Sequence, residues 1–362
     1  MQLAIPCALM RGGTSKALYF NEADLPKDIG IRDKVLLAAM GSPDARQIDG
    51  VGGAHPLTSK VAIISLSSRD DADIDYLFLQ ILVDKGEVSD SQNCGNILAG
   101  VGPFAIESGM VTARDGTTDV RIFMVNTGAM AVARVTTPNG IVNYSGEARV
   151  DGVPGTAAPI PIEFLNIAGS SCGALLPTGK ARDVIDDVAV TCIDNGMPVV
   201  ILNALDFGLT GAESPKQLET NTNLKKRVER IRIKAGLVMN LGDVTDKTVP
   251  KICLVSAPLN GGIINTRTFI PHRVHEAIGV LGSVSVATAA VIQDSVAFEI
   301  ARTQVQDGFN LLEVEHPTGH FSVEMTLEGA ALQQVTVKRA ALLRTARLLM
   351  RGEVFVPAGL QQ

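Results

Sequence analysis

The sequence predicts a mixed α/β protein of two similar domains, in each of which a curled, mostly antiparallel sheet surrounds a central helix. Three observations lead to this prediction. Short runs of β-branched and aliphatic residues recur along the chain, as expected of many strands. Two segments, 96–108 and about 283–292, are rich in small apolar residues and have no polar face, so other elements must enclose them if they are helices. The length of 362 residues allows two domains of ordinary size.

The predicted strands alternate in polarity or are continuously apolar. They cover 59–65, 76–83, 121–126, 131–136, 198–202, 251–256, 264–270, 311–314, 321–325 and 334–338. The segment 59–65 resembles 250–256, and each is followed later in the chain by one of the two small-residue segments. This internal sequence similarity supports the prediction of two similar domains.

The predicted helices differ in their surroundings. An apolar stripe over 222–239 predicts a surface helix, and another helix is expected over 31–40, ended by Gly-Ser-Pro. Within 96–108, Pro103 is expected to bend or break the helix after two turns. The turn-rich stretch 151–164 marks a boundary, so the first domain is expected over 1–160 and the second over 161–343.

Composition excludes several classes of protein. The apolar content of 46% with only 19% charged residues is typical of a compact globular chain. A net charge of −6, few aromatic residues and no Trp argue against nucleic acid as a partner. No apolar segment is long enough to span a membrane, and the N-terminus does not resemble a signal peptide, so we expect a cytoplasmic protein. Five widely spaced cysteines without a C-x-x-C pair are expected to be reduced.

The segment SQNCGNILAG (91–100) is the most informative for chemistry. Asn93 is a candidate N-cap, so the N–H groups of Cys94, Gly95 and Asn96 would lie at a helix start, where they can hold a carboxylate or an enolate oxygen. The same position favours the thiolate form of Cys94. The alternative is a buried structural cysteine at a helix cap.

Lys60 stands at the start of an apolar strand. A lysine in an apolar cleft gives up its proton more readily and can act as a general base. The alternative is a lysine at a strand end that reaches into solvent.

Two further segments carry groups that suit anions. In MRGGTSK (10–16), the glycine backbone, Arg11, Thr14 and Ser15 can bind an anion, although the segment lacks the spacing of a Walker A loop and a plain hairpin turn is the alternative. In 265–275, Arg267 and His272 can hold a second carboxylate. For the paired histidines 272/275 and 316/320 the sequence indicates no third ligand, and Pro317 and Gly319 make the second pair part of a turn, so no metal site is expected. Cys172, in a Cys-Gly turn, is interpreted as structural.

Several motifs together resemble one known family. They are MRGGTSK, MGSPDARQIDGVGG, LTSKVAII, QNCGNILAGVGPFAIESG, SSCGALLPTG, IDNGMP, MNLGDV and FIPHR. The chain is similar, over nearly its whole length, to the 4-oxalomesaconate tautomerase family, a branch of the methylaconitate and methylitaconate isomerases with a diaminopimelate epimerase-like fold. The resemblance implies that 344–362 returns to the first domain.

The resemblance also implies a reaction and its residues. We expect a cofactor-independent isomerase of unsaturated tricarboxylates, acting on 4-oxalomesaconate in the breakdown of aromatic acids such as gallate or protocatechuate. The family's lysine and cysteine carry over to Lys60 and Cys94; which of them is acid and which base stays open, as does keto–enol against allylic proton transfer. The segment 280–289, where epimerases carry a second cysteine, has none. The residues expected to contact substrate are Arg11, Thr14, Ser15, Gly95, Asn96, Arg267 and His272.

Other functions are compatible with some of the same residues. A methylaconitate or methylitaconate isomerase would share the same motifs and differ in pocket shape. A cysteine-dependent hydrolase or acyltransferase would use Cys94 as nucleophile with His55 or His272 as base. A homodimer is expected only because it is the commonest assembly of soluble enzymes.

Overall fold

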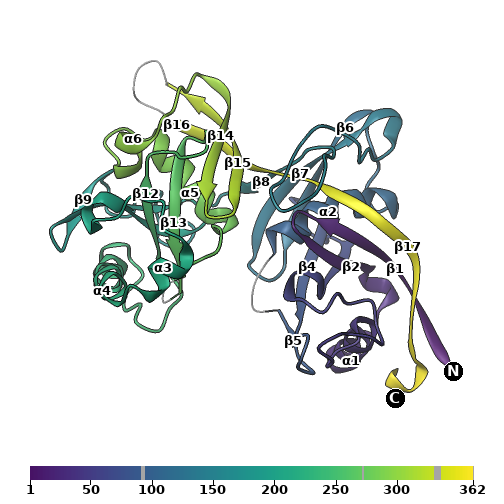
Figure 1. Cartoon of the computed structure of the whole chain (residues 1–362). Coiled ribbons are helices and arrows are strands. Elements are labelled where there is room, and N and C mark those ends of the chain that lie inside the picture. The colour runs from purple at the N-terminus through teal and green to yellow at the C-terminus, as the bar shows by residue number, and fades with distance from the viewer. Residues whose placement is uncertain (91–93, 271–272, 330–335, 362) are drawn as a thin grey trace. The chain divides into compact units, whose positions relative to one another are not determined.

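The computed structural model describes residues 1–90, 94–270, 273–329 and 336–361. The chain divides into two compact units, one formed by Met1–Leu165 with Arg344–Gln362 and the other by Asn166–Leu343 (Figure 1). Each unit contains a mostly antiparallel sheet and a buried helix, so the predicted fold class is confirmed.

The sheet of the first unit combines both ends of the chain. Its strands are β1 (Gln2–Gly12), β2 (Ser15–Asn21), β3 (Lys60–Leu66), β4 (Ile74–Ile81), β5 (Val88–Ser89), β6 (Gly116–Met124), β7 (Ala129–Thr137), β8 (Ile160–Leu165) and β17 (Ala346–Pro357). β1 lies antiparallel between β17 and β2, and the purple and yellow strands lie side by side in Figure 1. The pairs β2–β3 and β4–β6 are parallel, whereas β3–β4, β4–β5, β6–β7 and β7–β8 are antiparallel.

Helix α2 (Gly95–Glu107) is enclosed by this sheet. It contacts β1, β2, β3, β4, β6, β7 and β17. Small residues make this close approach feasible, because a Cβ on Gly100 would collide with the Tyr19 hydroxyl and one on Gly102 would lie 2.9 Å from Val135. The helix continues through Pro103 to Glu107, so the predicted break is wrong; Pro103 and Ala105 are both buried, and this packing offsets the backbone hydrogen bond that the proline removes.

Helix α1 (Ile29–Met40) covers the other face of the same sheet. Asp28 caps its N-terminus by accepting from the Ile31 N–H, and Gly41 ends it with a left-handed φ of 79°. Val61 and Ile63 of β3 pack in one apolar cluster with the α1 side chains. Since side chains alternate along a strand, Lys60 and its alternate neighbours in β3 face α2.

The second unit repeats the same order of strand pairings. Its strands are β9 (Asp183–Ile185), β10 (Val188–Asp194), β11 (Pro198–Asn203), β12 (Lys251–Ser256), β13 (Ile264–Phe269), β14 (Gly308–His316), β15 (Gly319–Glu328) and β16 (Thr336–Arg344). As with β1–β2–β3–β4–β6–β7, the pairs β10–β11, β12–β13 and β14–β15 are antiparallel, while β11–β12 and β13–β14 are parallel.

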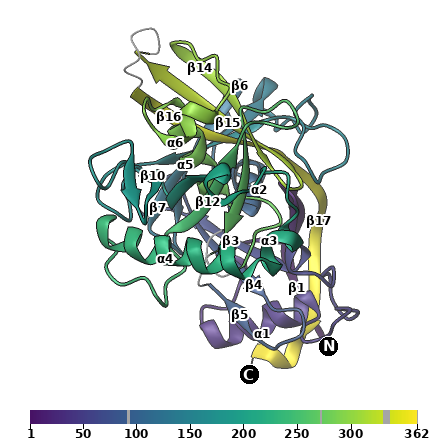
Figure 2. The same ribbon diagram turned by 60° about the vertical axis from the view of Figure 1, so that its left-hand side comes forward.

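The helices of the second unit take corresponding places. α5 (Val280–Val291) is buried and contacts β10, β11, β14 and β15, whereas α4 (Thr222–Val238) packs on the other face, through Leu224, Val228 and Ile231 (Figure 2). The short elements are α3 (Pro215–Thr220), α6 (Val296–Ile300), η1 (Glu22–Asp24), η2 (Pro56–Thr58), η3 (Pro138–Gly140), η4 (Ala204–Phe207) and η6 (Ala358–Gln361).

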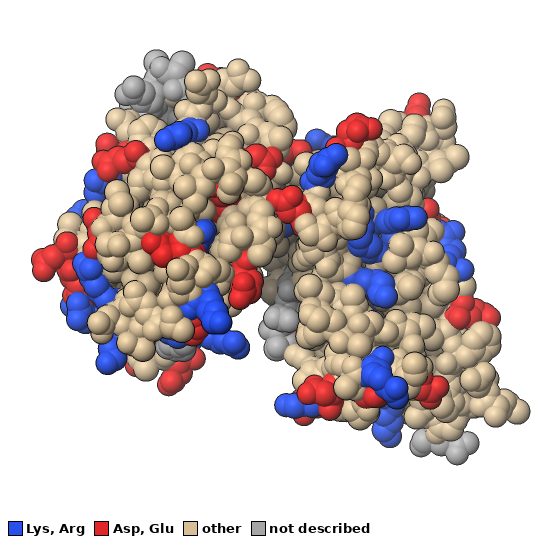
Figure 3. Space-filling model, in the orientation of Figure 1, with Lys and Arg blue, Asp and Glu red and all other residues tan. Residues whose placement is uncertain are grey.

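Acidic and basic side chains are interspersed on the visible face of each unit (Figure 3). Within the described ranges, no helix is both long and apolar enough to cross a bilayer.

Candidate active site

The start of α2 is the centre of the candidate site. The helix begins at Gly95 with Cys94 as its N-cap, one residue later than expected, and Asn93 lies outside the described residues. The Cys94 side chain makes no capping hydrogen bond, so the first N–H groups of the helix are not capped by it. A helix start of this kind favours an anion, either a thiolate at Cys94 or an oxygen of a ligand.

Cys94 differs from the other four cysteines in its surroundings. It is half-buried, whereas the others are buried. Burial raises the pKa of Cys7 to about 11 and the pKa of Cys172, Cys192 and Cys253 to about 12. These four thiols are therefore protonated and unreactive at neutral pH, which leaves Cys94 as the cysteine suited to chemistry.

The loop after β1 packs directly against the first turn of α2. A Cβ on Gly12 would collide with the Asn96 carbonyl oxygen, and one on Gly13, which has φ +50°, would collide with Asn96 Oδ1. The Asn96 side-chain amide donates to Thr14 Oγ1 at 3.1 Å. The two glycines of MRGGTSK are thus required by close approach to the helix, and Thr14 is engaged by Asn96.

Ser15 opens β2 beside this loop. Its side chain is buried, at 2% exposure, and its Oγ has no hydrogen-bond partner among the described residues. Ser15 is paired with Gly12 in the β1–β2 register, which places it next to the segment that touches Asn96. A buried hydroxyl without a partner is costly, so this group is suited to bind a ligand oxygen.

Arg11 mainly stabilises the first unit through hydrogen bonds to its backbone. Its Nη1 donates to the Gly13 carbonyl, the Thr345 carbonyl and Thr345 Oγ1, each at 3.0 Å. Burial and the nearby charge of Arg347 lower the pKa of Arg11. The two arginines also line a cavity of about 650 Å³ together with Tyr144. Through its three hydrogen bonds, one edge of the Arg11 guanidinium holds in place the segment that contains Gly12 and Gly13, which we call the glycine loop.

Lys60 is buried with a neutral partner. It is 6% exposed; its Nζ donates to Gln80 Oε1 at 2.7 Å and lies 5.0 Å from the centre of the Phe78 ring. The Gln80 amide donates in turn to the Ser59 carbonyl at 2.8 Å, which fixes its orientation. Because Lys60 is buried, the structure contradicts the alternative of a strand-end lysine that reaches into solvent. None of the ion pairs in the described ranges involves it.

Two tyrosines, which sequence reasoning missed, connect these groups. The Tyr76 hydroxyl donates to the Cys94 carbonyl at 3.3 Å, and the Tyr19 hydroxyl donates to the Ile97 carbonyl at 2.5 Å. Burial, followed by the charge of a Cys94 thiolate, raises the pKa of both tyrosines. Tyr76 and Gln80 alternate along the same face of β4, so Lys60 and Cys94 lie on one side of the sheet.

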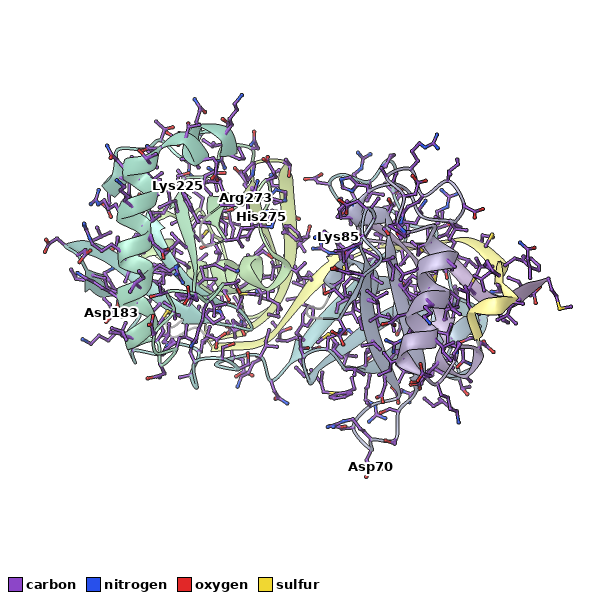
Figure 4. The ribbon with its side chains drawn as sticks, turned by 90° about the horizontal axis from the view of Figure 1, so that it is seen from below. Asp70, Lys85, Asp183, Lys225, Arg273 and His275 are labelled. Atoms are coloured by element: carbon purple, nitrogen blue, oxygen red, sulfur yellow. The ribbon has the colours of Figure 1, made fainter. Side chains whose placement is uncertain are left out.

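The expected residues of the second unit have other partners. Arg267 is 7% exposed and donates to the Glu213 carbonyl at 2.6 Å and to Asn265 Oδ1 at 2.9 Å. It pairs with Leu254, which packs in the cluster with α4, and so faces away from α5. His272 lies outside the described residues. Arg273 and His275, labelled in Figure 4, follow β13; the pKa of His275 is lowered by burial and then by the charge of Lys251.

Sequence comparison identifies the family of this chain. The profile of the family described as "PrpF protein" matches residues 2–357. The chain belongs to the PrpF protein family. The resemblance expected from the sequence motifs is thereby confirmed.

Three relatives of this PrpF-family chain cover nearly its whole length. It is 59% identical to a protein of Pseudomonas putida named 4-oxalomesaconate tautomerase, over 98% of this chain and 97% of the relative. It is 58% identical to a protein of Novosphingobium sp. named (4E)-oxalomesaconate Delta-isomerase, over 97% of each chain. A crystal structure of methylitaconate-delta-isomerase superposes with a TM-score of 0.90 and 35% identity, covering 100% of this chain and 97% of that one.

The comparisons also bear on the alternative that this chain is a cysteine-dependent hydrolase. The named relatives are isomerases or tautomerases, and nothing supports a hydrolase. His55, one of the bases considered for that reaction, is exposed and caps η2, where its Nδ1 accepts from the Leu57 N–H at 3.1 Å. Among the residues that the structure describes, no group of three or more His, Cys, Asp and Glu is placed to hold a metal ion.

Proposed function

We propose that this chain is a 4-oxalomesaconate tautomerase that moves a proton within its substrate without a cofactor. The observation that carries the substrate is the 59% identity, over almost the full length, to the protein of that name. The first unit supports the reaction type, because it places a buried lysine and a half-buried cysteine on the α2 side of one sheet.

The chemistry has simple requirements. In 4-oxalomesaconate, C–H bonds next to a carbonyl and a conjugated alkene are acidic, and removal of one proton gives a dienolate whose charge spreads over several oxygens. The enzyme needs a base at the carbon, donors for the enolate oxygens and an acid that returns the proton at the new position. Both keto–enol tautomerisation and a 1,3-allylic shift begin with this deprotonation.

Lys60 is proposed as one of the two proton-transfer groups. Its Nζ donates to the Gln80 amide oxygen and lies beside the face of Phe78, and none of the ion pairs in the described ranges involves it. Gln80 is itself held by the Ser59 carbonyl, so it orients the amine without competing for its charge. These contacts hold the amine in one position on the α2 side of the sheet.

Cys94 is proposed as the second proton-transfer group, acting opposite to Lys60. The thiol sits at the N-cap of α2, where the helix start favours its anionic form. Gly95 and Asn96 would direct their backbone N–H groups to the dienolate oxygens, and the Ser15 hydroxyl would add a further hydrogen bond. Which of Lys60 and Cys94 removes the first proton stays open.

The proposed substrate contacts are not equally supported. Ser15 has an unused hydroxyl, whereas Thr14 already accepts from Asn96 and Arg11 braces the glycine loop. Thr14 and Arg11 are therefore proposed to shape the loop that meets the substrate. Arg267 has partners in its own unit, which support a structural role for it.

A comparison of substrates tests the proposal. The purified protein is assayed separately with 4-oxalomesaconate, methylaconitate and methylitaconate, following the loss of each substrate by proton NMR. We expect kcat/KM for 4-oxalomesaconate to exceed the other two by at least about a hundredfold, about 2.7 kcal/mol of transition-state discrimination. Faster conversion of methylitaconate would instead favour the function named for the relative of 35% identity.

A further inference from the structure

Two arginines stand opposite each other in the sheet of the first unit. Arg11 of β1 is paired with Arg347 of β17 in the antiparallel register. Side chains that are directly opposite in such a pair lie on the same face, with Cβ atoms about 4.5–5.5 Å apart, and like charges placed in this way are destabilising. The register of β2 adds a third cation, because Lys16 lies opposite Arg11 on its other side. The three cations form a row across β17, β1 and β2.

No described carboxylate neutralises this row. None of the ion pairs in the part of the chain that the structure describes involves Arg11, Lys16 or Arg347. Burial, and then the positive charge of Arg347, lowers the pKa of Arg11. A pair of guanidinium groups held together in this way would be stabilised by an anion that accepts hydrogen bonds from both.

The two arginines line a cavity large enough for a small molecule. Its volume of about 650 Å³ lies in the usual range of ligand sites. The opposite wall is the segment 144–157, in which Ala148 and Ala157 exchange two backbone hydrogen bonds of 3.0 Å. Glu147 also lines the cavity and is exposed, so the lining carries two positive charges and one negative charge. The cavity therefore favours an anion.

This cavity is separate from the candidate active site. Leu9 of β1 lies opposite Leu18 of β2, and both pack in the apolar cluster with α1. Arg11 follows Leu9 by two residues, so its side chain is on that face of the sheet. Lys60 is paired with Ala17, the neighbour of Leu18, and is therefore on the opposite face. A ligand between the two arginines would not occupy the position of the proposed proton-transfer groups.

We propose that this cavity is a second binding site, for a small anion that bears a carboxylate or phosphate group. Arg11 uses Nη1 for its bonds to Gly13 and Thr345, whereas its Nε and Nη2 have no hydrogen-bond partner among the described residues. These donors and the guanidinium of Arg347 can share the oxygens of one anionic group. The site goes beyond the proposed function, because it uses neither Lys60 nor Cys94.

Isothermal titration calorimetry tests the site without any turnover. Inorganic phosphate and tricarballylate, a saturated tricarboxylate, are titrated separately into the wild-type protein, Arg347→Met and Arg351→Met at constant ionic strength. Arg351→Met is the matched control, because it removes the same charge from an exposed position of β17 where Arg351 pairs with Glu107 at 2.7 Å. Since a tricarboxylate also resembles the proposed substrate, only the binding that Arg347→Met removes is assigned to the cavity.

We expect at least one of the two anions to bind the wild-type protein with a Kd below about 1 mM and to bind Arg347→Met at least about tenfold more weakly. Arg351→Met should stay within about twofold of wild type. Dependence on Arg347 for phosphate alone would identify a phosphate-bearing ligand, and for tricarballylate alone a carboxylate ligand. Equal affinities for wild type and Arg347→Met, equal losses in the two variants, or no binding of either anion up to about 10 mM would overturn the proposal.

Thermal unfolding gives a second measurement on the same samples. In buffer free of multivalent anions, Arg347→Met should melt no earlier than wild type, because it removes one of two like charges on opposed strands. The anion that binds should raise the melting temperature of wild type and leave that of Arg347→Met unchanged. If Arg347→Met is not folded, Arg347→Gln takes its place with the same expected results. Neither measurement uses 4-oxalomesaconate, so failure of this proposal and failure of the proposed function are distinguishable.

Discussion

Replacement of Lys60 by Met removes the proposed proton-transfer amine and keeps a side chain of similar length and volume. A general base or acid contributes about 10²–10⁴-fold to a rate. No other residue of β3 carries a group that could transfer a proton in place of Lys60. We therefore expect kcat to fall by at least about a thousandfold, equivalent to about 4 kcal/mol in activation free energy.

The same change should leave the fold intact. The variant loses one hydrogen bond, from Nζ to Gln80 Oε1 at 2.7 Å, while the Gln80 amide keeps its bond to the Ser59 carbonyl at 2.8 Å. Leaving a buried acceptor without its donor costs about 1–3 kcal/mol, and the thioether no longer requires desolvation of a charge, which offsets part of that cost. We expect the free energy of unfolding to change by no more than about 2 kcal/mol.

The assay pairs turnover of 4-oxalomesaconate with urea unfolding on the same samples. The chain offers a matched control in Lys251, which begins β12 and pairs with Val199 as Lys60 begins β3 and pairs with Ala17. Lys251 donates to the Thr248 carbonyl at 2.5 Å, so Lys251→Met removes an amine from the corresponding strand. That variant should keep full activity. A folded Lys60→Met protein with more than a tenth of wild-type kcat would refute the role of the lysine.

Three further predictions concern the cysteines and the glycine loop. Cys94→Ser should lower kcat by about a hundredfold or more while the melting temperature stays within a few degrees, measured in the same turnover assay and by calorimetry; unchanged kcat would contradict the role of the thiol. Gly13→Ala, with φ +50° and a Cβ that collides with Asn96, should cost about 1–3 kcal/mol in urea unfolding, whereas Gly86→Ala, which meets nothing within 4 Å, should cost under about 1 kcal/mol. Burial raises the pKa of Cys253 from 9.0 to about 12, so the unfolded chain loses this proton first and the stabilisation present below pH 9 is lost as the pH rises toward 12. Urea unfolding at pH 8, 9.5 and 11 should show a steeper loss of stability in the wild type than in Cys253→Ala, by about 1.4 kcal/mol per pH unit; equal slopes would show that this thiol titrates normally.

Local composition was sufficient to predict the central features of the fold. The segments 96–108 and 283–292 were identified as enclosed helices because they lack a polar face, and they correspond to α2 and α5. The terminal strands β1 and β17 were not predicted. Their pairing joins opposite ends of the chain, and β17 is mostly exposed between its two ends, so it has no apolar periodicity to detect.

The site was predictable where a residue type conflicts with its sequence neighbours. Lys60 stands out because it precedes a run of apolar residues, and the paired glycines before Thr14 indicate a close approach of the backbone. Tyr19 and Tyr76 gave no such signal. Their hydrogen bonds to the carbonyls of Ile97 and Cys94 join segments far apart in the sequence, so the two buried tyrosines are recognised only once the structure is known.

The proposed function requires that the chain catalyse proton transfer on 4-oxalomesaconate through a dienolate, without a cofactor. Proton NMR in deuterated water tests it most directly, by following which substrate carbon gains deuterium in the presence of the wild-type protein dialysed against chelator, with Lys60→Met as the reference. We expect rapid incorporation of solvent deuterium at the carbon that receives the returning proton, and incorporation at no more than about a thousandth of that rate with Lys60→Met. Exchange by the wild-type protein no faster than in buffer alone would show that the proposed proton transfer does not occur.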